Sequence, residues 1–121
     1  MSVRIYHNPR CSKSRQTLRL IQEAGIEPEV VEYLETPPST QELGQILQKL
    51  GIQPEELMRK GEPIYKELGL AKRDLSRKEV IQLLHEHPKL IERPIVVKGE
   101  QAVLGRPPEN ILQLIKSSAR S

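Results

Sequence analysis

The residue of this chain with the clearest chemical potential is its only cysteine. Cys11 lies in the segment HNPRCSKSR, where Arg10, Lys13 and Arg15 flank it and His7 precedes it. Nearby positive charges stabilise a thiolate, which is the reactive form of cysteine. His7 could add to this effect if it is protonated or if it donates a hydrogen bond. The same charges would attract an oxyanion. The segment therefore predicts a nucleophilic thiolate with a binding site for an oxyanion substrate beside it.

The residues on either side of Cys11 place it between a strand and a helix. Residues 3–7 alternate apolar and polar side chains, which is typical of a short strand. A helix is predicted from Ser14 to a stop at Gly25 by the spacing of Thr17, Leu18, Ile21 and Ala24. Unpaired backbone N–H groups at a helix N-terminus favour an anion. We therefore expect the pKa of Cys11 to lie below the usual thiol value of about 8.5.

Other interpretations of a single cysteine can be compared with this one. Free cysteines are often simply buried, but the turn at Pro9 and the helix start favour a reactive thiol. A cysteine phosphatase loop needs an arginine six positions after the nucleophile, where this chain has Thr17. A dithiol oxidoreductase needs C-x-x-C, and the second position here is Ser14. Any redox cycle must therefore use thiols of another molecule.

The rest of the chain continues the alternation of strands and helices. Residues 29–34 form a second strand, so the N-terminal third predicts a βαβ unit with parallel strands. Two capping boxes and two prolines then mark helical segments. These are a helix after Ser39 that ends at Gly51, a short helix from Pro54, turns over 63–70, and a helix after Ser76 that ends by Pro88. A hairpin of residues 95–98 and 102–104 and a final helix near Pro108 complete the order.

This order predicts an α/β fold of the thioredoxin-like class. The sheet is mixed and has flanking helices, and a helical insert at about residues 39–88 separates the βαβ half from the ββα half. No linker or repeat divides the sequence, so we expect one domain over residues 1–121.

Composition excludes several classes of function. The chain has 121 residues and a formal net charge of only +3, and aromatic residues make up 2% of it, which argues against nucleic-acid binding. No apolar run is long enough for a membrane span or a signal peptide. A single cysteine cannot form an internal disulfide, which agrees with a cytoplasmic location. His85 and His87 have no matching ligands nearby, so we expect no metal site.

Four separated motifs together resemble one known family. HNPRCSKSR, ELMRKGEPIYKELGL, ERPIVVKG and VLGRP occur in this order between Ile5 and about Leu114. They resemble the ArsC-type arsenate reductases that use glutathione and glutaredoxin and have a thioredoxin-like fold with a helical insert. The resemblance implies an oxidoreductase that converts arsenate to arsenite, with glutathione as co-substrate, glutaredoxin as partner and no bound cofactor.

The resemblance also implies roles for individual residues. Cys11 would be the nucleophile, and His7 would help to stabilise its thiolate. The arginines around the oxyanion would be Arg59, Arg93 and Arg106. Support for the loop would come from Ser14, from Arg15 and from Pro94, which would follow a cis peptide bond.

The chemistry of arginine agrees with this implied site. A guanidinium group offers paired N–H donors that suit a tetrahedral oxyanion, and it stays charged at any working pH. Arg59, Arg93 and Arg106 all lie at the ends of predicted elements, where sites are commonly assembled. Each of them alone would be interpreted as a surface charge, as Arg73 and Arg77 are.

Two other functions stay open at this point. Spx-type transcriptional regulators share the fold family and bind RNA polymerase, but their redox switch uses a C-x-x-C pair. A monothiol glutaredoxin-like protein would act on glutathionylated substrates without arsenate. The chain also has Ser12 and Lys13 where arsenic-resistance enzymes have a Gly-containing pair, which concerns the choice of oxyanion and leaves the nucleophile in place.

Overall fold

The computed structural model describes residues 2–119, and the side chains of residues 2–115. The chain divides into two compact units. The first unit contains the described residues up to Thr36 and those from Arg93 onward, and the second is Pro37–Glu92. The second unit encloses the helical insert predicted at about residues 39–88. The single domain over residues 1–121 stays a prediction.

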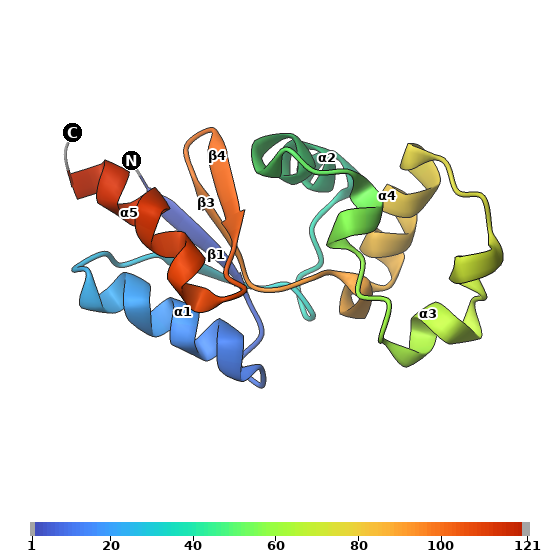
Figure 1. The fold of residues 1–121 in the computed structure, drawn as a ribbon, viewed down its shortest axis with the longest axis horizontal. Coiled ribbons are helices and arrows are strands. Elements are labelled where there is room, and N and C mark those ends of the chain that lie inside the picture. The colour runs from blue at the N-terminus through green and yellow to red at the C-terminus, as the bar shows by residue number, and fades with distance from the viewer. Residues whose placement is uncertain (1, 120–121) are drawn as a thin grey trace. The chain divides into compact units, whose positions relative to one another are not determined.

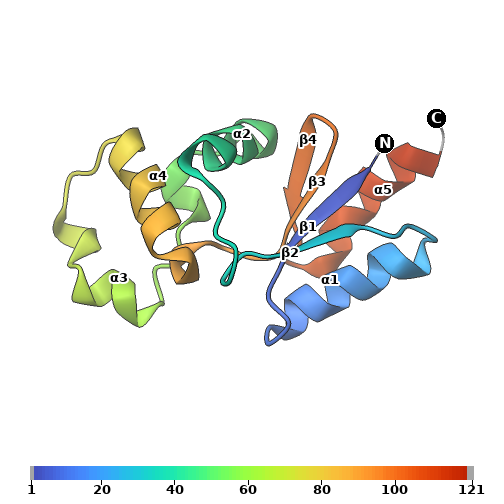
Figure 2. The same ribbon diagram turned by 180° about the vertical axis from the view of Figure 1, so that it is seen from behind.

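A four-stranded mixed sheet forms the centre of the first unit (Figures 1 and 2). Its strands are β1 (Val3–His7), β2 (Glu29–Glu32), β3 (Ile95–Lys98) and β4 (Gln101–Leu104). They lie in the order β2-β1-β3-β4, in which β1 is parallel to β2 and antiparallel to β3. Ile5 pairs with Val30 on one side and with Val96 on the other. The predicted βαβ and ββα halves are therefore confirmed, together with the thioredoxin-like class.

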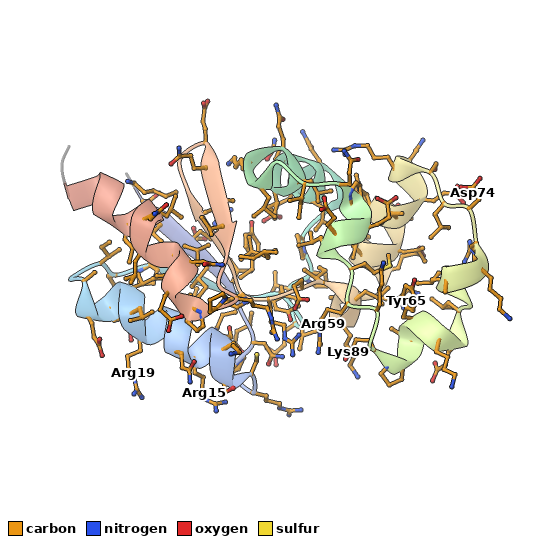
Figure 3. All side chains as sticks on the ribbon, in the orientation of Figure 1. Arg15, Arg19, Arg59, Tyr65, Asp74 and Lys89 are labelled. Atoms are coloured by element: carbon orange, nitrogen blue, oxygen red, sulfur yellow. The ribbon has the colours of Figure 1, made fainter. Side chains whose placement is uncertain are left out.

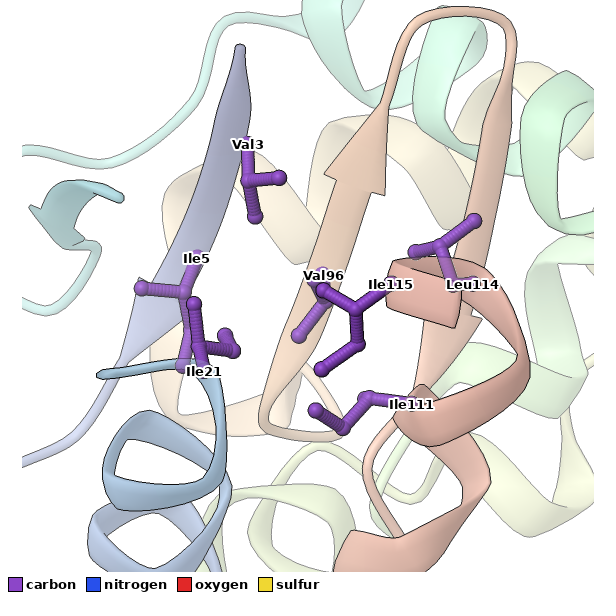
Figure 4. Packing of buried hydrophobic residues seen from close by; sticks show 7 residues of the cluster. All are labelled: Val3, Ile5, Ile21, Val96, Ile111, Leu114 and Ile115. Atoms are coloured by element: carbon purple, nitrogen blue, oxygen red, sulfur yellow. The ribbon is translucent and has the colours of Figure 1, made fainter. Parts of the chain in front are cut away.

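The helices of the first unit pack against one face of this sheet through aliphatic side chains (Figure 4). They are α1 (Ser12–Glu23), η4 (Pro108–Ile111) and α5 (Leu112–Ala119). The strands contribute alternate residues, as a period of two requires. The buried cluster comprises Val3, Ile5, Ile21, Val96, Ile111, Leu114 and Ile115. Because His7 continues the same alternation from Val3 and Ile5, the packing also directs its side chain toward α1.

Some element boundaries differ from the sequence-based expectations, and the first helix begins at Ser12 rather than at Ser14. The second strand ends at Glu32 and not at residue 34, because the N–H groups of Glu35 and Thr36 turn back to the carbonyl of Glu32. The hairpin is one residue longer than predicted, since Gln101 pairs with Lys98 across a two-residue turn. Gly99 in that turn has φ +61°, a conformation in which residues with a Cβ are strained.

The second unit is helical. Its elements are α2 (Thr40–Leu50), η1 (Pro54–Leu57), α3 (Pro63–Glu67), η2 (Leu70–Lys72), α4 (Arg77–Glu86) and η3 (Pro88–Leu90). α2 packs against α4. Ser39 and Ser76 cap α2 and α4 as predicted, each accepting a hydrogen bond from the backbone N–H three residues later. The short helix from Pro54 stops at Leu57 because Met58 is extended and forms a bridge with Ile91. No described helix is long and apolar enough to cross a bilayer.

Candidate active site

The loop that carries Cys11 is held in place by its own backbone and by two neighbouring side chains. The N–H of Cys11 donates to the carbonyl of Asn8 at 3.0 Å, and the N–H of Arg10 donates to Asn8 Oδ1 at 3.0 Å. Arg15 Nη1 donates to the carbonyl of Pro9 at 2.9 Å. Cys11 is the N-cap residue of α1 and has extended dihedral angles. The thiol is therefore at the helix N-terminus, as the sequence predicted.

Ser14 connects this loop to the buried end of β1. Its side chain is completely buried, and its Oγ lies 2.6 Å from Nδ1 of His7. The same oxygen accepts a hydrogen bond from the backbone N–H of Asn8 at 3.0 Å. One hydroxyl thus joins the strand end, the loop and the first turn of α1.

Several groups act together on the pKa of Cys11. Burial of the half-exposed sulfur raises this pKa. The backbone N–H of Ser14, the charge of Arg93, the backbone N–H of Lys13 and the charge of Arg106 all lower it. The lowering contributions prevail, so the pKa of Cys11 lies below its ordinary value. At neutral pH this increases the thiolate fraction, which is the form that attacks an electrophile.

The pKa of His7 does not favour a positive charge on its imidazole. Its side chain is only 6% exposed, and burial lowers its pKa below the ordinary value, with a smaller lowering by Arg15 that opposes a raising effect of Glu32. The imidazole is therefore neutral at neutral pH. Of the two contributions that the sequence left open for His7, a hydrogen bond is favoured over a positive charge. That bond reaches the loop through Ser14.

We expect Ser14→Ala to lower the free energy of unfolding by about 1–3 kcal/mol, because it leaves buried groups of His7 and Asn8 without their hydroxyl partner. Urea denaturation measures the effect. The matched control is Ser12→Ala, since Ser12 is exposed in the same turn and should change stability by less than about 0.5 kcal/mol. Equal stability of the two variants would contradict this role of Ser14.

Arg93 and Arg106 come from the two ends of the β3–β4 hairpin. Arg93 precedes β3 by two residues, and Arg106 follows β4 by two residues. Arg106 Nη1 donates to the carbonyl of Arg93 at 3.3 Å, so one guanidinium is fixed against the backbone of the other arginine. The Arg93–Pro94 peptide bond is cis, as the resemblance implied, and the Arg106–Pro107 bond is also cis. Asn110 Nδ2 donates to the carbonyl of Arg106 at 3.0 Å.

Gly105 allows these two segments to approach α1. Its N–H donates to the carbonyl of Pro94 at 2.9 Å. A Cβ at this position would lie 2.6 Å from Thr17 Oγ1 and 2.8 Å from Pro94 Cγ, both closer than van der Waals contact allows. Only glycine therefore fits between the helix that carries Cys11 and the segments that carry the two arginines.

Gly105→Ala should destabilise the protein by about 1–3 kcal/mol, because the added methyl group forces α1 and Pro94 apart. Thermal or urea denaturation measures the change. Gly44→Ala is the control: Gly44 lies within α2 with nothing within 4 Å of the added Cβ, so alanine should stabilise the helix by about 0.5–1 kcal/mol. The close packing at Gly105 would be disproved by a variant as stable as the parent.

Arg59 belongs to the second unit and has acidic partners there. Its Nη1 lies 3.1 Å from Glu62 Oε2, and its Nε lies 4.0 Å from Glu92 Oε1. Its backbone N–H donates to the carbonyl of Leu90 at 2.7 Å, beside the bridge between Met58 and Ile91. These contacts hold the guanidinium of Arg59 in place within the second unit.

The structure assembles most of the residues that the sequence singled out within the first unit. They are His7, Cys11, Ser14, Arg15, Arg93, Pro94 and Arg106. Sequence reasoning missed Asn8, Gly105 and Asn110, which position the loop and the arginine segments. The Asn-Pro pair at 8–9 is a recognised turn signal and could have indicated Asn8. Among the described residues, no three His, Cys, Asp or Glu side chains are grouped to hold a metal ion.

Comparison with known proteins gives a consistent result. A sequence profile of the ArsC family matches residues 6–114. The chain is 48% identical to a protein of Haemophilus influenzae named arsenate reductase, over 95% of this chain and all of the relative. It is 54% identical to an Escherichia coli protein named YfgD, described as uncharacterised, over 93% of this chain and 96% of the relative. A solved structure of arsenate reductase from Vibrio cholerae is 54% identical and superimposes with a TM-score of 0.90, covering 93% of this chain and 97% of that one.

Proposed function

Because the chain belongs to the ArsC family, we infer that it is an arsenate reductase whose nucleophile is Cys11. The main support for this function is the set of groups around the thiol that stabilise its thiolate. Two backbone N–H groups and the charges of Arg93 and Arg106 favour its thiolate. Two relatives of high identity, one of them a solved structure, bear the name arsenate reductase.

The first chemical step joins sulfur to arsenic. The Cys11 thiolate attacks the arsenic of arsenate, an S–As bond forms, and one As–O bond breaks to release hydroxide or, after protonation, water. Negative charge on the arsenate oxygens increases as the thiolate approaches. Arg93 and Arg106 offset this charge, which lowers the barrier when the donors are already in position. The contact of Arg106 with the Arg93 carbonyl supplies part of that preorganisation.

Electron balance requires thiols from outside the chain. Reduction of As(V) to As(III) takes two electrons, and oxidation of two thiols to a disulfide supplies two. The chain has one cysteine, which is regenerated at the end of the cycle, so both oxidised thiols come from outside the chain. Glutathione adds to the arsenic on Cys11, forming a second S–As bond and releasing water. A glutaredoxin thiol then attacks the glutathione sulfur, forming a glutaredoxin–glutathione disulfide and leaving two electrons on arsenic. Water breaks the remaining bond between Cys11 and As(III), which releases arsenite and the Cys11 thiol. A reducing cytoplasm, which maintains such thiols, is the compartment that we propose.

Arg59 is the third arginine that we assign to the oxyanion. We expect Arg59→Ala to lower kcat/KM for arsenate by about a hundredfold, the effect of removing one donor to a developing oxyanion. Coupled turnover measures it, and Arg73→Ala, which changes an exposed arginine of the same unit, should leave turnover unchanged. A monothiol glutaredoxin-like protein would give the opposite pattern. It would release glutathione from a glutathionylated peptide at the same rate with or without Arg59, and it would not need arsenate.

The proposed function is tested by omitting one component at a time from a complete assay. NADPH oxidation is followed with arsenate, glutathione, glutathione reductase and a purified glutaredoxin. We expect turnover only when all are present, and one arsenite formed for each NADPH oxidised. NADPH oxidation that continues without arsenate would contradict the function, and so would a complete mixture that forms no arsenite.

A further inference from the structure

The helix that begins at the thiol carries positive charge on the side that faces away from the sheet. Arg15 and Arg19 are exposed and are four residues apart, so their side chains lie on the same side of α1, as Figure 3 shows. Arg10, in the loop before the helix, is exposed as well. We call these three arginines, Arg10, Arg15 and Arg19, the basic face.

The charge of the basic face is not neutralised by ion pairs. Within the described part of the chain, none of its three arginines forms an ion pair. The only acidic residue of α1 is Glu23, which follows Arg19 by four residues and forms no ion pair with it. Like charges four residues apart destabilise a helix slightly, so the pair Arg15 and Arg19 does not serve helix stability. The formal net charge of the chain is +3, so the remainder of the chain is neutral without these arginines.

We propose that the basic face is the surface on which the protein thiol donor docks, through an acidic patch beside the donor's own thiol. The proposal rests on the function proposed above, which requires a glutaredoxin to reach Cys11. Exposed charges of this kind increase the rate at which an oppositely charged protein meets its target. The basic face lies in the loop and helix that carry Cys11, so it would attract the donor to the site of its reaction.

The length of the basic face favours a protein over glutathione as its occupant. Arg19 follows Cys11 by eight residues, which corresponds to about 12 Å along a helix. Glutathione has three residues, spans about 10 Å when extended and carries its thiol in the middle. With its sulfur at Cys11, the tripeptide uses the loop end of the face, near Arg15. Arg19 extends the surface in the direction that only a larger partner covers.

The test uses the full chain with glutathione joined to Cys11 as a mixed disulfide, so it does not depend on arsenate. The reductant thiol attacks this disulfide, takes up the glutathione and leaves Cys11 as a thiolate. The rate of release is measured for the parent, for Arg19→Glu and for the matched control Arg73→Glu. Each is reduced by a purified acidic glutaredoxin, by glutathione and by uncharged dithiothreitol, at low and at high salt.

We expect Arg19→Glu to slow release by the glutaredoxin about tenfold at low salt, with a smaller difference at high salt. Arg73→Glu should behave as the parent, and dithiothreitol should reduce all three proteins equally. The proposal is overturned if Arg19→Glu and Arg73→Glu react alike with the glutaredoxin. It is also overturned if glutathione or dithiothreitol is slowed as much as the glutaredoxin, because the effect would then lie at Cys11 itself. Failure of arsenate turnover in the separate assay would reject the reductase and leave these rates interpretable.

Discussion

Cys11→Ser should have no measurable arsenate-dependent turnover. The serine hydroxyl stays protonated at neutral pH, so the backbone N–H groups and arginines that stabilise a thiolate have no anion to act on. No other cysteine is present to replace the nucleophile. The loss should appear in kcat, because the side chains assigned to oxyanion binding remain. The coupled NADPH assay measures turnover, and calorimetry measures how tightly the variant still binds arsenate.

The free energy of unfolding provides the control for this variant. The side chain of Cys11 makes no capping hydrogen bond to α1, and serine is a favourable N-cap residue, so stability should be at least that of the parent. Parent-like turnover by a folded Cys11→Ser protein would reject the assignment of the nucleophile. An unfolded variant would show that Cys11 is needed for structure, which its half-exposed position does not predict.

Replacement of Arg93 should give the second large effect. Its charge lowers the pKa of Cys11, so Arg93→Ala should shift the rise of thiol reactivity toward higher pH. The sign follows from the thiolate, which loses a favourable interaction and persists only at higher pH. The variant also loses a donor to the arsenate oxygens, so kcat/KM for arsenate should fall by about a hundredfold to a thousandfold. The pH dependence of thiol alkylation and of arsenate turnover measures both changes.

Arg93→Lys separates the two contributions of this residue. Lysine keeps the charge, so the pKa of Cys11 should stay close to that of the parent, whereas the planar pair of donors is lost and arsenate turnover should still decrease. Arg106→Ala should shift the thiol pKa in the same direction but less, since Arg106 is more exposed and contributes less. If Arg93→Ala leaves the pH profile unchanged, Arg93 does not stabilise the thiolate.

The part of the site that is local in sequence could be predicted from the sequence. The position of Cys11 at a helix N-terminus follows from the strand and helix patterns on its two sides, and those patterns depend on side chains within about a dozen residues. The capping serines of α2 and α4 follow from short-range signals in the same way. The selection of Arg59, Arg93 and Arg106 did not follow from any pattern of this kind. It came from the family resemblance, since each of these arginines alone is typical of a surface.

The remaining features depend on contacts between distant segments. The close approach at Gly105 requires Thr17 and Pro94 to meet the same backbone, which no local pattern shows. Whether His7 carries a charge depends on how deeply the end of β1 is buried, and only the packed unit determines this. The early end of β2 likewise results from turn hydrogen bonds that compete with a sequence favourable to a strand.

The most direct test of thiolate chemistry on arsenate at Cys11 is the rate of its alkylation by iodoacetamide as a function of pH, with and without arsenate. A single cysteine makes the signal unambiguous. We predict a midpoint clearly below the usual thiol value of about 8.5 and a marked slowing of alkylation by arsenate. A midpoint of an ordinary thiol, together with a rate that arsenate does not change, would contradict both the activation of Cys11 and the presence of the oxyanion beside it.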